Sequence, residues 1–287
     1  MGNNIRTKQA LVITAIVLLV GFLFTREIKG LVVPKKEETA QMPTQTTETA
    51  SLEEVSATAK NLVSVAFAKD ITALENTYKS ATGSDKIANA KQLAQKWDDV
   101  EQATPSALYL EVVANAEPTL INWLNAGGRL LKSFENTQDS ASIKPILLQK
   151  ANVAFTKALA IDSASLDAKT GLGITIVNGM GAPMQGIGML LDVVKKDPKN
   201  LKANMNLAMF AIKSGQFDKA IIRFKEIISN IKATPDAYFY LATAYESLGK
   251  NTEAIDAYLS SKKLAANPTL SKFIDKKIAE LKVNVNK

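Results

Sequence analysis

Apolar residues recur at intervals of three and four along almost all of the chain after residue 50. This spacing places them on one face of an α-helix and is typical of helices that pack on a common core. No alternating strand-like run with hairpin signals follows, so the pattern predicts an all-α fold. The first helix is predicted to begin with a capping box formed by Ser51 and Glu54. Its apolar stripe is predicted to run through Val55, Ala59, Leu62, Ala66, Ile71, Leu74 and Tyr78.

The beginning of the chain carries a different pattern. An uninterrupted run without charged residues, apolar at almost every position, extends from Ala10 to Phe24. As a helix it would cover about 23 Å, somewhat less than the ~30 Å hydrocarbon core of a bilayer. A cleaved signal peptide and an uncleaved anchor both fit such a run. Because the small residues of a cleavage site are absent after it, we expect a transmembrane signal-anchor over residues 10–25, preceded by a short polar tail over residues 1–9.

Positive charges flank this run on both sides. The positive-inside rule, read literally, favours a cytoplasmic carboxyl side, but long domains translocate largely regardless of charge. We expect a single-pass protein of the inner (cytoplasmic) membrane with a periplasmic soluble domain, and a cytoplasmic soluble domain is the alternative. Residues 26–50 are rich in threonine, proline and charge, so they are predicted to form a disordered tether.

The last third of the chain contains a repeat of 34 residues, with copies at 201–234 and 235–268. The paired positions are Leu207 and Leu241, Ala208 and Ala242, Gly215 and Gly249, Ala220 and Ala254, and Phe224 and Tyr258. This pattern resembles the tetratricopeptide repeat (TPR), a pair of antiparallel helices. The resemblance implies a right-handed TPR-type α-solenoid of helical hairpins, which would lie behind the N-terminal transmembrane helix.

Earlier segments resemble the same repeat less clearly. Residues 166–200 form a third unit, with Gly186 at the small position of its second helix. Helices around Trp123 and Phe155 form a fourth, separated by about twelve inserted residues around 136–144. A fifth, degenerate unit precedes them.

These units divide the chain after residue 50 into three parts. An N-terminal helical region with degenerate TPR-like units covers 51–135, and the TPR array covers 136–266. A capping helix with one polar face, 267–287, closes the array, as a solenoid requires.

Composition removes several functional classes. The chain has no cysteine and no histidine, so thiol nucleophiles, disulfides and histidine-dependent catalysis are excluded. The net charge of +7 lies largely at the membrane flanks and the carboxyl end, without the aromatic or arginine interleaving that nucleic-acid binding uses. Asp98, Asp99 and Glu101 are interpreted as a solvated helix face. We expect no catalytic, cofactor-binding or metal-binding residues and no nucleic-acid partner.

The TPR resemblance implies a concave face formed by repeat positions 2, 5, 9 and 12 of each first helix. Two methionines on this face suit adaptable packing against a partner segment. The alternative is that these residues contact a neighbouring helix or the terminal cap. The predicted protein-binding groove consists of Lys202, Met205, Met209, Ile212, Asp236, Phe239, Thr243, Glu246, Ile174 and Val177.

The sequence therefore predicts a non-catalytic, membrane-anchored TPR scaffold or adaptor. It would dock an unidentified partner protein or peptide in its concave groove, in envelope protein assembly or chaperoning. One alternative is an envelope enzyme that uses carboxylates in the region 51–135. Another is a purely structural module that self-associates.

Overall fold

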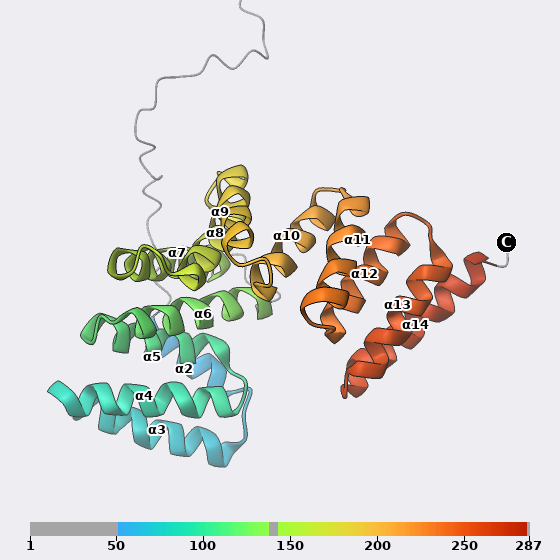
Figure 1. The fold of residues 1–287 in the computed structure, drawn as a ribbon. Helices are drawn as coiled ribbons and strands as arrows, with labels where there is room; N and C mark the ends of the chain where they lie inside the picture. The colour runs from blue at the N-terminus through green and yellow to red at the C-terminus, as the bar shows by residue number, and fades with distance from the viewer. Residues whose placement is uncertain (1–50, 138–142, 286–287) are drawn as a thin grey trace, which may run out of the picture. The chain divides into compact units, whose positions relative to one another are not determined.

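The computed structural model describes residues 51–137 and 143–285 of the chain (Figure 1). Every regular element among these residues is a helix, in agreement with the predicted all-α fold. The predicted polar tail, transmembrane anchor and tether lie outside the described residues. Within the described part of the chain, no helix is both long and apolar enough to cross a membrane.

The described helices follow one another as packed neighbours. Each helix contacts the next one in the sequence, as the adjacent colours in Figure 1 show. Such local contacts are the organisation of a repeat solenoid. In chain order the elements are α2 (Leu52–Lys60), α3 (Val65–Ser80), α4 (Gly83–Asp99), α5 (Ala103–Ala116), α6 (Leu120–Asn136), α7 (Ile143–Ile161), α8 (Leu166–Gly179), α9 (Pro183–Lys196), α10 (Leu201–Lys213), α11 (Phe217–Glu226), the π-helical segment η1 (Ile227–Ile231), α12 (Pro235–Ser247), α13 (Asn251–Leu264) and α14 (Pro268–Val285).

Local sequence signals fix several helix ends. The Ser51 hydroxyl oxygen accepts a hydrogen bond of 3.2 Å from the backbone N–H of Glu54, so the predicted N-cap is present. Gly215 and Gly249 follow α10 and α12 in left-handed conformations, with φ of 73° and 69°. Glycine adopts this conformation without the steric cost of a β-carbon. The turns inside these two hairpins therefore follow the repeat pattern seen in the sequence.

Small residues lie where paired helices approach most closely. A β-carbon at Gly186 of α9 would lie 2.5 Å from the carbonyl oxygen of Gly173 in α8. Ala220 of α11 and Ala254 of α13 hold the equivalent repeat position in the next two pairs, and both are completely buried. The close crossing predicted at this position is present at Gly186, and the burial of Ala220 and Ala254 agrees with it.

The apolar stripe predicted for one helix after residue 51 is divided between two. Helix α2 ends at Lys60, and α3 begins after Ser64, whose hydroxyl oxygen accepts a hydrogen bond from the backbone N–H of Phe67 at 3.3 Å. Leu62 lies in the turn between them and is 70% exposed. The prediction that Leu62 continues the buried stripe was therefore wrong, because the turn changes the face on which later residues lie.

Only the two ends of the insertion predicted around 136–144 belong to helices. Helix α6 extends to Asn136 and α7 begins at Ile143, so the connection between them is short. Between these helices and α8, the ring of Phe155 in α7 lies against Gly127 and Gly171. A β-carbon at either glycine would collide with this ring, so both glycines allow α7 to approach its neighbours.

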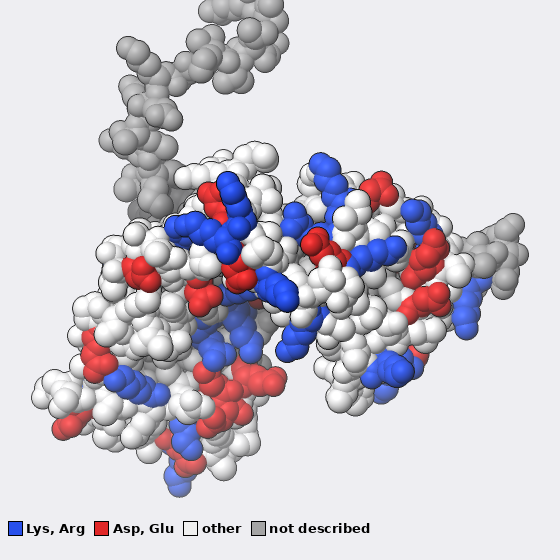
Figure 2. Space-filling view, in the orientation of Figure 1, with Lys and Arg blue, Asp and Glu red and all other residues white. Residues whose placement is uncertain are grey.

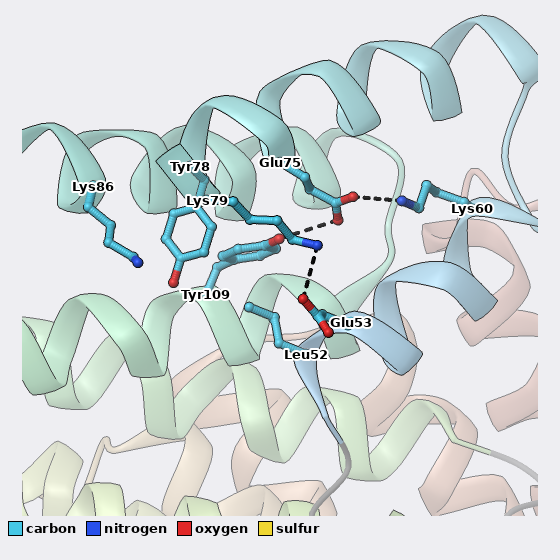
Figure 3. A pocket seen from close by; sticks show the side chains of 8 residues that line it. All are labelled: Leu52, Glu53, Lys60, Glu75, Tyr78, Lys79, Lys86 and Tyr109. Carbon is cyan, nitrogen blue, oxygen red and sulfur yellow. Dashed lines mark hydrogen bonds and ion pairs between the residues drawn. The ribbon is translucent and has the colours of Figure 1, made fainter. Parts of the chain in front are cut away.

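A buried carboxylate holds α2 against the following helices. Glu75 of α3 accepts hydrogen bonds from the Ser56 hydroxyl and, at 3.3 Å, from the Tyr109 hydroxyl. Its other oxygen lies 2.6 Å from the ammonium nitrogen of Lys60 (Figure 3). Burial, and then the charge of Glu75, raise the pKa of the Tyr109 hydroxyl, so this group stays protonated and donates. Because Ser56 and Lys60 belong to α2 and Tyr109 to α5, this network joins three helices.

Helix α10 contributes to two separate groups of buried apolar side chains. Ala203, Leu207 and Phe210 pack with residues of α5 to α9. Ala208 packs with residues of α11 to α14, and Met205 lies at the edge of that second group. Helix α10 therefore supplies buried side chains both to the core formed with the helices before it and to the core formed with the helices after it.

Candidate protein-binding groove

Five helices line a groove with a volume of about 660 Å³. Four of them, α6, α8, α10 and α12, are the first helices of successive pairs, and α7 adds one residue at its start. The lining residues are Phe134, Glu135, Asn136, Lys144, Asn178, Met205, Asn206, Met209, Phe210, Ile212, Lys213, Asp236 and Tyr240.

Helix α10 supplies the apolar centre of this groove. Met205, Met209 and Ile212 follow each other at intervals of four and three, so their side chains share one face of the helix. All three are partly exposed, and all line the groove. Flexible methionine side chains adapt their shape to a contacting surface. This face of α10 can therefore accept an apolar segment of another molecule.

Charged residues surround the apolar centre. Lys213 donates a hydrogen bond of 3.1 Å to the side-chain oxygen of Asn178, and Lys144 lies 5.7 Å from the centre of the Phe134 ring. Desolvation raises the pKa of the Glu135 carboxyl, and the positive charges of Lys202 and Lys213 oppose this effect. On the face shown in Figure 2, basic and acidic side chains are interspersed over the helices.

The structure brings four of the ten predicted groove residues together in this lining. They are Met205, Met209, Ile212 and Asp236. Lys202 is exposed on the same helix, and its charge acts on Glu135, but it does not line the groove.

Three predicted residues of α12 make contacts within the protein instead. The ring of Phe239 lies 6.0 Å from the ring of Phe273 in α14. The Glu246 carboxylate accepts hydrogen bonds of 2.8 Å from the Tyr258 hydroxyl and from the ammonium group of Lys277. The Thr243 hydroxyl donates to the carbonyl oxygen of Phe239 at 3.0 Å. Phe239 and Glu246 thus contact the cap, the alternative left open by the sequence.

The two predicted residues of α8 are not free to meet a partner in this structure. Ile174 is 1% exposed and belongs to the buried core, so its assignment to the groove surface was wrong. Val177 is partly buried and packs against the same core, beside Gly186. Helices α8 and α9 approach closely where Gly173 faces Gly186, and Val177 lies at this close approach.

Sequence reasoning missed the contribution of α6 and α7. Phe134, Glu135 and Lys144 lie in or beside the segment interpreted as an insertion. The apolar residues of α6 recur at intervals of three and four as far as Phe134, and this pattern could have extended the predicted helix to Asn136. Tyr240 was missed because it occupies repeat position 6, next to the positions used to define the concave face.

Carboxylates in the region 51–135 form ion pairs with neighbouring helices. Asp98 lies 2.6 Å from the guanidinium of Arg129, so its interpretation as part of a solvated face was wrong. Asp99 instead accepts a hydrogen bond of 2.9 Å from Gln95 on its own helix. Within residues 51–137 and 143–285, no group of three or more acidic side chains is arranged to hold a metal ion.

The geometry defines an all-α solenoid with a groove along the first helices of its hairpins, a class whose inner faces serve as binding surfaces. A tetratricopeptide-repeat family model matches residues 236–275, which include most of α12, all of α13 and the start of α14. This part of the chain therefore matches a tetratricopeptide repeat, and the helices before it share the arrangement of such repeats. Proteins of this family generally act as scaffolds for protein interactions.

Solved structures share this fold. The crystal structure of TTC0263, a thermophilic TPR protein from Thermus thermophilus, matches with a TM-score of 0.55 at 16% identity, covering 67% of this chain and 99% of that one. PilW, described as a widely conserved type IV pilus biogenesis factor, matches with a TM-score of 0.51 at 17% identity, covering 71% of this chain and 93% of that one. At these identities the likeness shows the fold alone.

One curated relative is similar in sequence over part of the chain. Anaphase-promoting complex subunit 3 of Dictyostelium discoideum is 33% identical over 128 residues, which are 44% of this chain. The match spans 13% of the length of that protein.

Proposed function

We propose that the protein is a scaffold that docks an apolar segment of a partner protein in the groove centred on α10. The observation that carries this proposal is the partly exposed face of Met205, Met209 and Ile212 inside a groove lined by five helices. A volume of about 660 Å³ accommodates several apolar side chains of a bound helix or extended peptide.

Aromatic side chains continue this surface from the groove towards the cap. Tyr240 lines the groove, and its ring lies 5.6 Å from that of Phe239, which in turn lies 6.0 Å from the ring of Phe273. Phe273 is 47% exposed. Exposed aromatic rings are frequent anchors of protein interfaces. A partner segment that fills the groove can therefore extend its contacts along these rings to α14.

Two substitutions in the groove test this function. Lysine at both Met205 and Met209 is expected to weaken capture of the partner about tenfold or more, because an apolar contact would have to bury two ammonium groups. The measurement is in-cell cross-linking and affinity purification of the full chain. Met184→Lys is the matched control, because Met184 lies on α9, is 76% exposed and does not line the groove. A partner that the double variant retains would contradict groove docking, and light scattering that shows only self-association would favour the oligomerisation module.

We further propose that residues 10–25 anchor this scaffold in the inner membrane, with its repeats in the periplasm. The support is the apolar run from Ala10 to Phe24 and the polar, threonine-rich segment that follows it. In spheroplasts, external protease is expected to remove an epitope placed after Lys287 while a cytoplasmic marker survives. An epitope protected until the membrane is permeabilised would put the repeats in the cytoplasm instead.

A further inference from the structure

A second pocket lies between α2, α3, α4 and α5, which precede all the residues that line the groove. Its volume is about 300 Å³, at the lower end of the range of small-molecule pockets. The lining residues are Leu52, Glu53, Lys60, Glu75, Tyr78, Lys79, Lys86 and Tyr109 (Figure 3). None of them belongs to the predicted or observed protein-binding groove.

Two of the three lysines in this pocket have carboxylate partners. Lys60 pairs with Glu75 at 2.6 Å, and Lys79 pairs with Glu53 at 2.9 Å. Lys86 has no carboxylate within 4.0 Å among the described residues, and its ammonium nitrogen lies 5.1 Å from the centre of the Tyr78 ring. The lining therefore carries one positive charge more than its two carboxylates balance.

A second donor lies beside Lys86. The Tyr78 hydroxyl makes no hydrogen bond to any described residue, and burial raises its pKa, so it remains protonated. In Figure 3 the Lys86 ammonium and the Tyr78 hydroxyl lie at the same end of the pocket, away from the ion pair of Lys60 and Glu75. Because Tyr78 comes from α3 and Lys86 from α4, two helices place unpaired donors at one point.

We propose that this pocket binds a small molecule that carries one anionic group, a carboxylate or a phosphate, between Lys86 and Tyr78. The anionic oxygens accept hydrogen bonds from the ammonium and hydroxyl groups, which are stronger for a charged acceptor than for a neutral one. The Tyr109 ring and Leu52 offer apolar contact to the remainder of the ligand. This site is independent of the groove on α10, so either can fail without the other.

Titration of the full chain with acetate and, separately, with inorganic phosphate tests this proposal. We expect at least one of the two probes to change the amide NMR chemical shifts of residues in α3 and α4, and these changes should saturate as the probe concentration rises. Chloride keeps the ionic strength constant during the titration. The probe that saturates identifies the anionic group. Lys86→Gln removes the cation and is expected to weaken binding about tenfold or more, and Tyr78→Phe removes only the hydroxyl and is expected to weaken it severalfold.

Lys96→Gln is the control, because Lys96 lies exposed on the same helix and outside the pocket. It is expected to bind as the parent does. The proposal is overturned if neither probe gives saturating shifts, or if Lys86→Gln binds the probe as tightly as the parent. Thermal midpoints of the variants establish that they are folded, and the Tyr78→Phe ring preserves the packing between Tyr78 and Tyr109.

Discussion

Replacing Gly186 by alanine is expected to destabilise the array by about 2–3 kcal/mol. The added β-carbon would lie 2.5 Å from the Gly173 carbonyl oxygen and 2.7 Å from a methyl group of Val177. The carbonyl belongs to the backbone of α8, so the two helices must separate before the methyl group fits. At roughly 2–4 °C per kcal/mol for a chain of this size, the thermal midpoint by circular dichroism should fall by about 5–10 °C.

Gly188→Ala is the matched control for this result. Gly188 lies on the same helix two residues later, and its β-carbon would meet no atom of another helix within 4 Å. Alanine there is expected to raise stability by up to about 1 kcal/mol, because it reduces the freedom of the unfolded chain and favours the helix. Equal midpoints for the two variants would contradict the close crossing of α8 and α9.

The second large effect is expected for Glu75→Ala, at about 2–4 kcal/mol. Glu75 is 9% exposed, and its removal leaves the Tyr109 and Ser56 hydroxyls without their acceptor and Lys60 without its carboxylate partner. Buried groups that lose a partner retain their desolvation penalty without the compensating contact. Urea unfolding measures the loss, and hydrogen exchange should show the largest gain in exchange in α2.

Glu53→Ala distinguishes this network from an ordinary surface ion pair. Glu53 lies on the same helix as Lys60 and pairs with Lys79, but the Lys79 and Glu53 side chains are 58% and 74% exposed. Water screens such a pair, so its loss is expected to leave the urea midpoint within experimental error. If Glu75→Ala also unfolds at the parental midpoint, the buried network does not hold α2.

The parts of the fold that the sequence predicted are those with short, local signals. Gly215 and Ala220 both belong to one hairpin. Gly215 indicates the turn between its two helices, and Ala220 indicates the place where these helices cross. The break between α2 and α3 carries no glycine or proline, only a cap at Ser64, and the apolar spacing continues across it through Leu62. Periodicity alone cannot separate one helix from two in such a case.

The site was predicted only where the repeat is regular. Met205 and Met209 line the groove, and they lie in the copy of the 34-residue repeat at 201–234. The position of a residue within its repeat does not show whether a later helix covers its side chain. The contact of Phe239 with Phe273 of α14 could therefore not be predicted from the repeat. Nor does repeat numbering reveal which positions of a first helix are covered by its neighbours, and Ile174, at 1% exposure, is such a position.

The position of α10 in two cores has a consequence for the energetics of the array. A solenoid behaves as a row of coupled units, and the strength of the coupling decides whether the row unfolds together or in pieces. Ala203 and Leu207 connect α10 to the units before it, and Ala208 connects it to the units after it. A partner bound at Met205 and Met209, as proposed, would stabilise this one helix by mass action. Because α10 belongs to both cores, unfolding of the units on either side of it would then become less favourable.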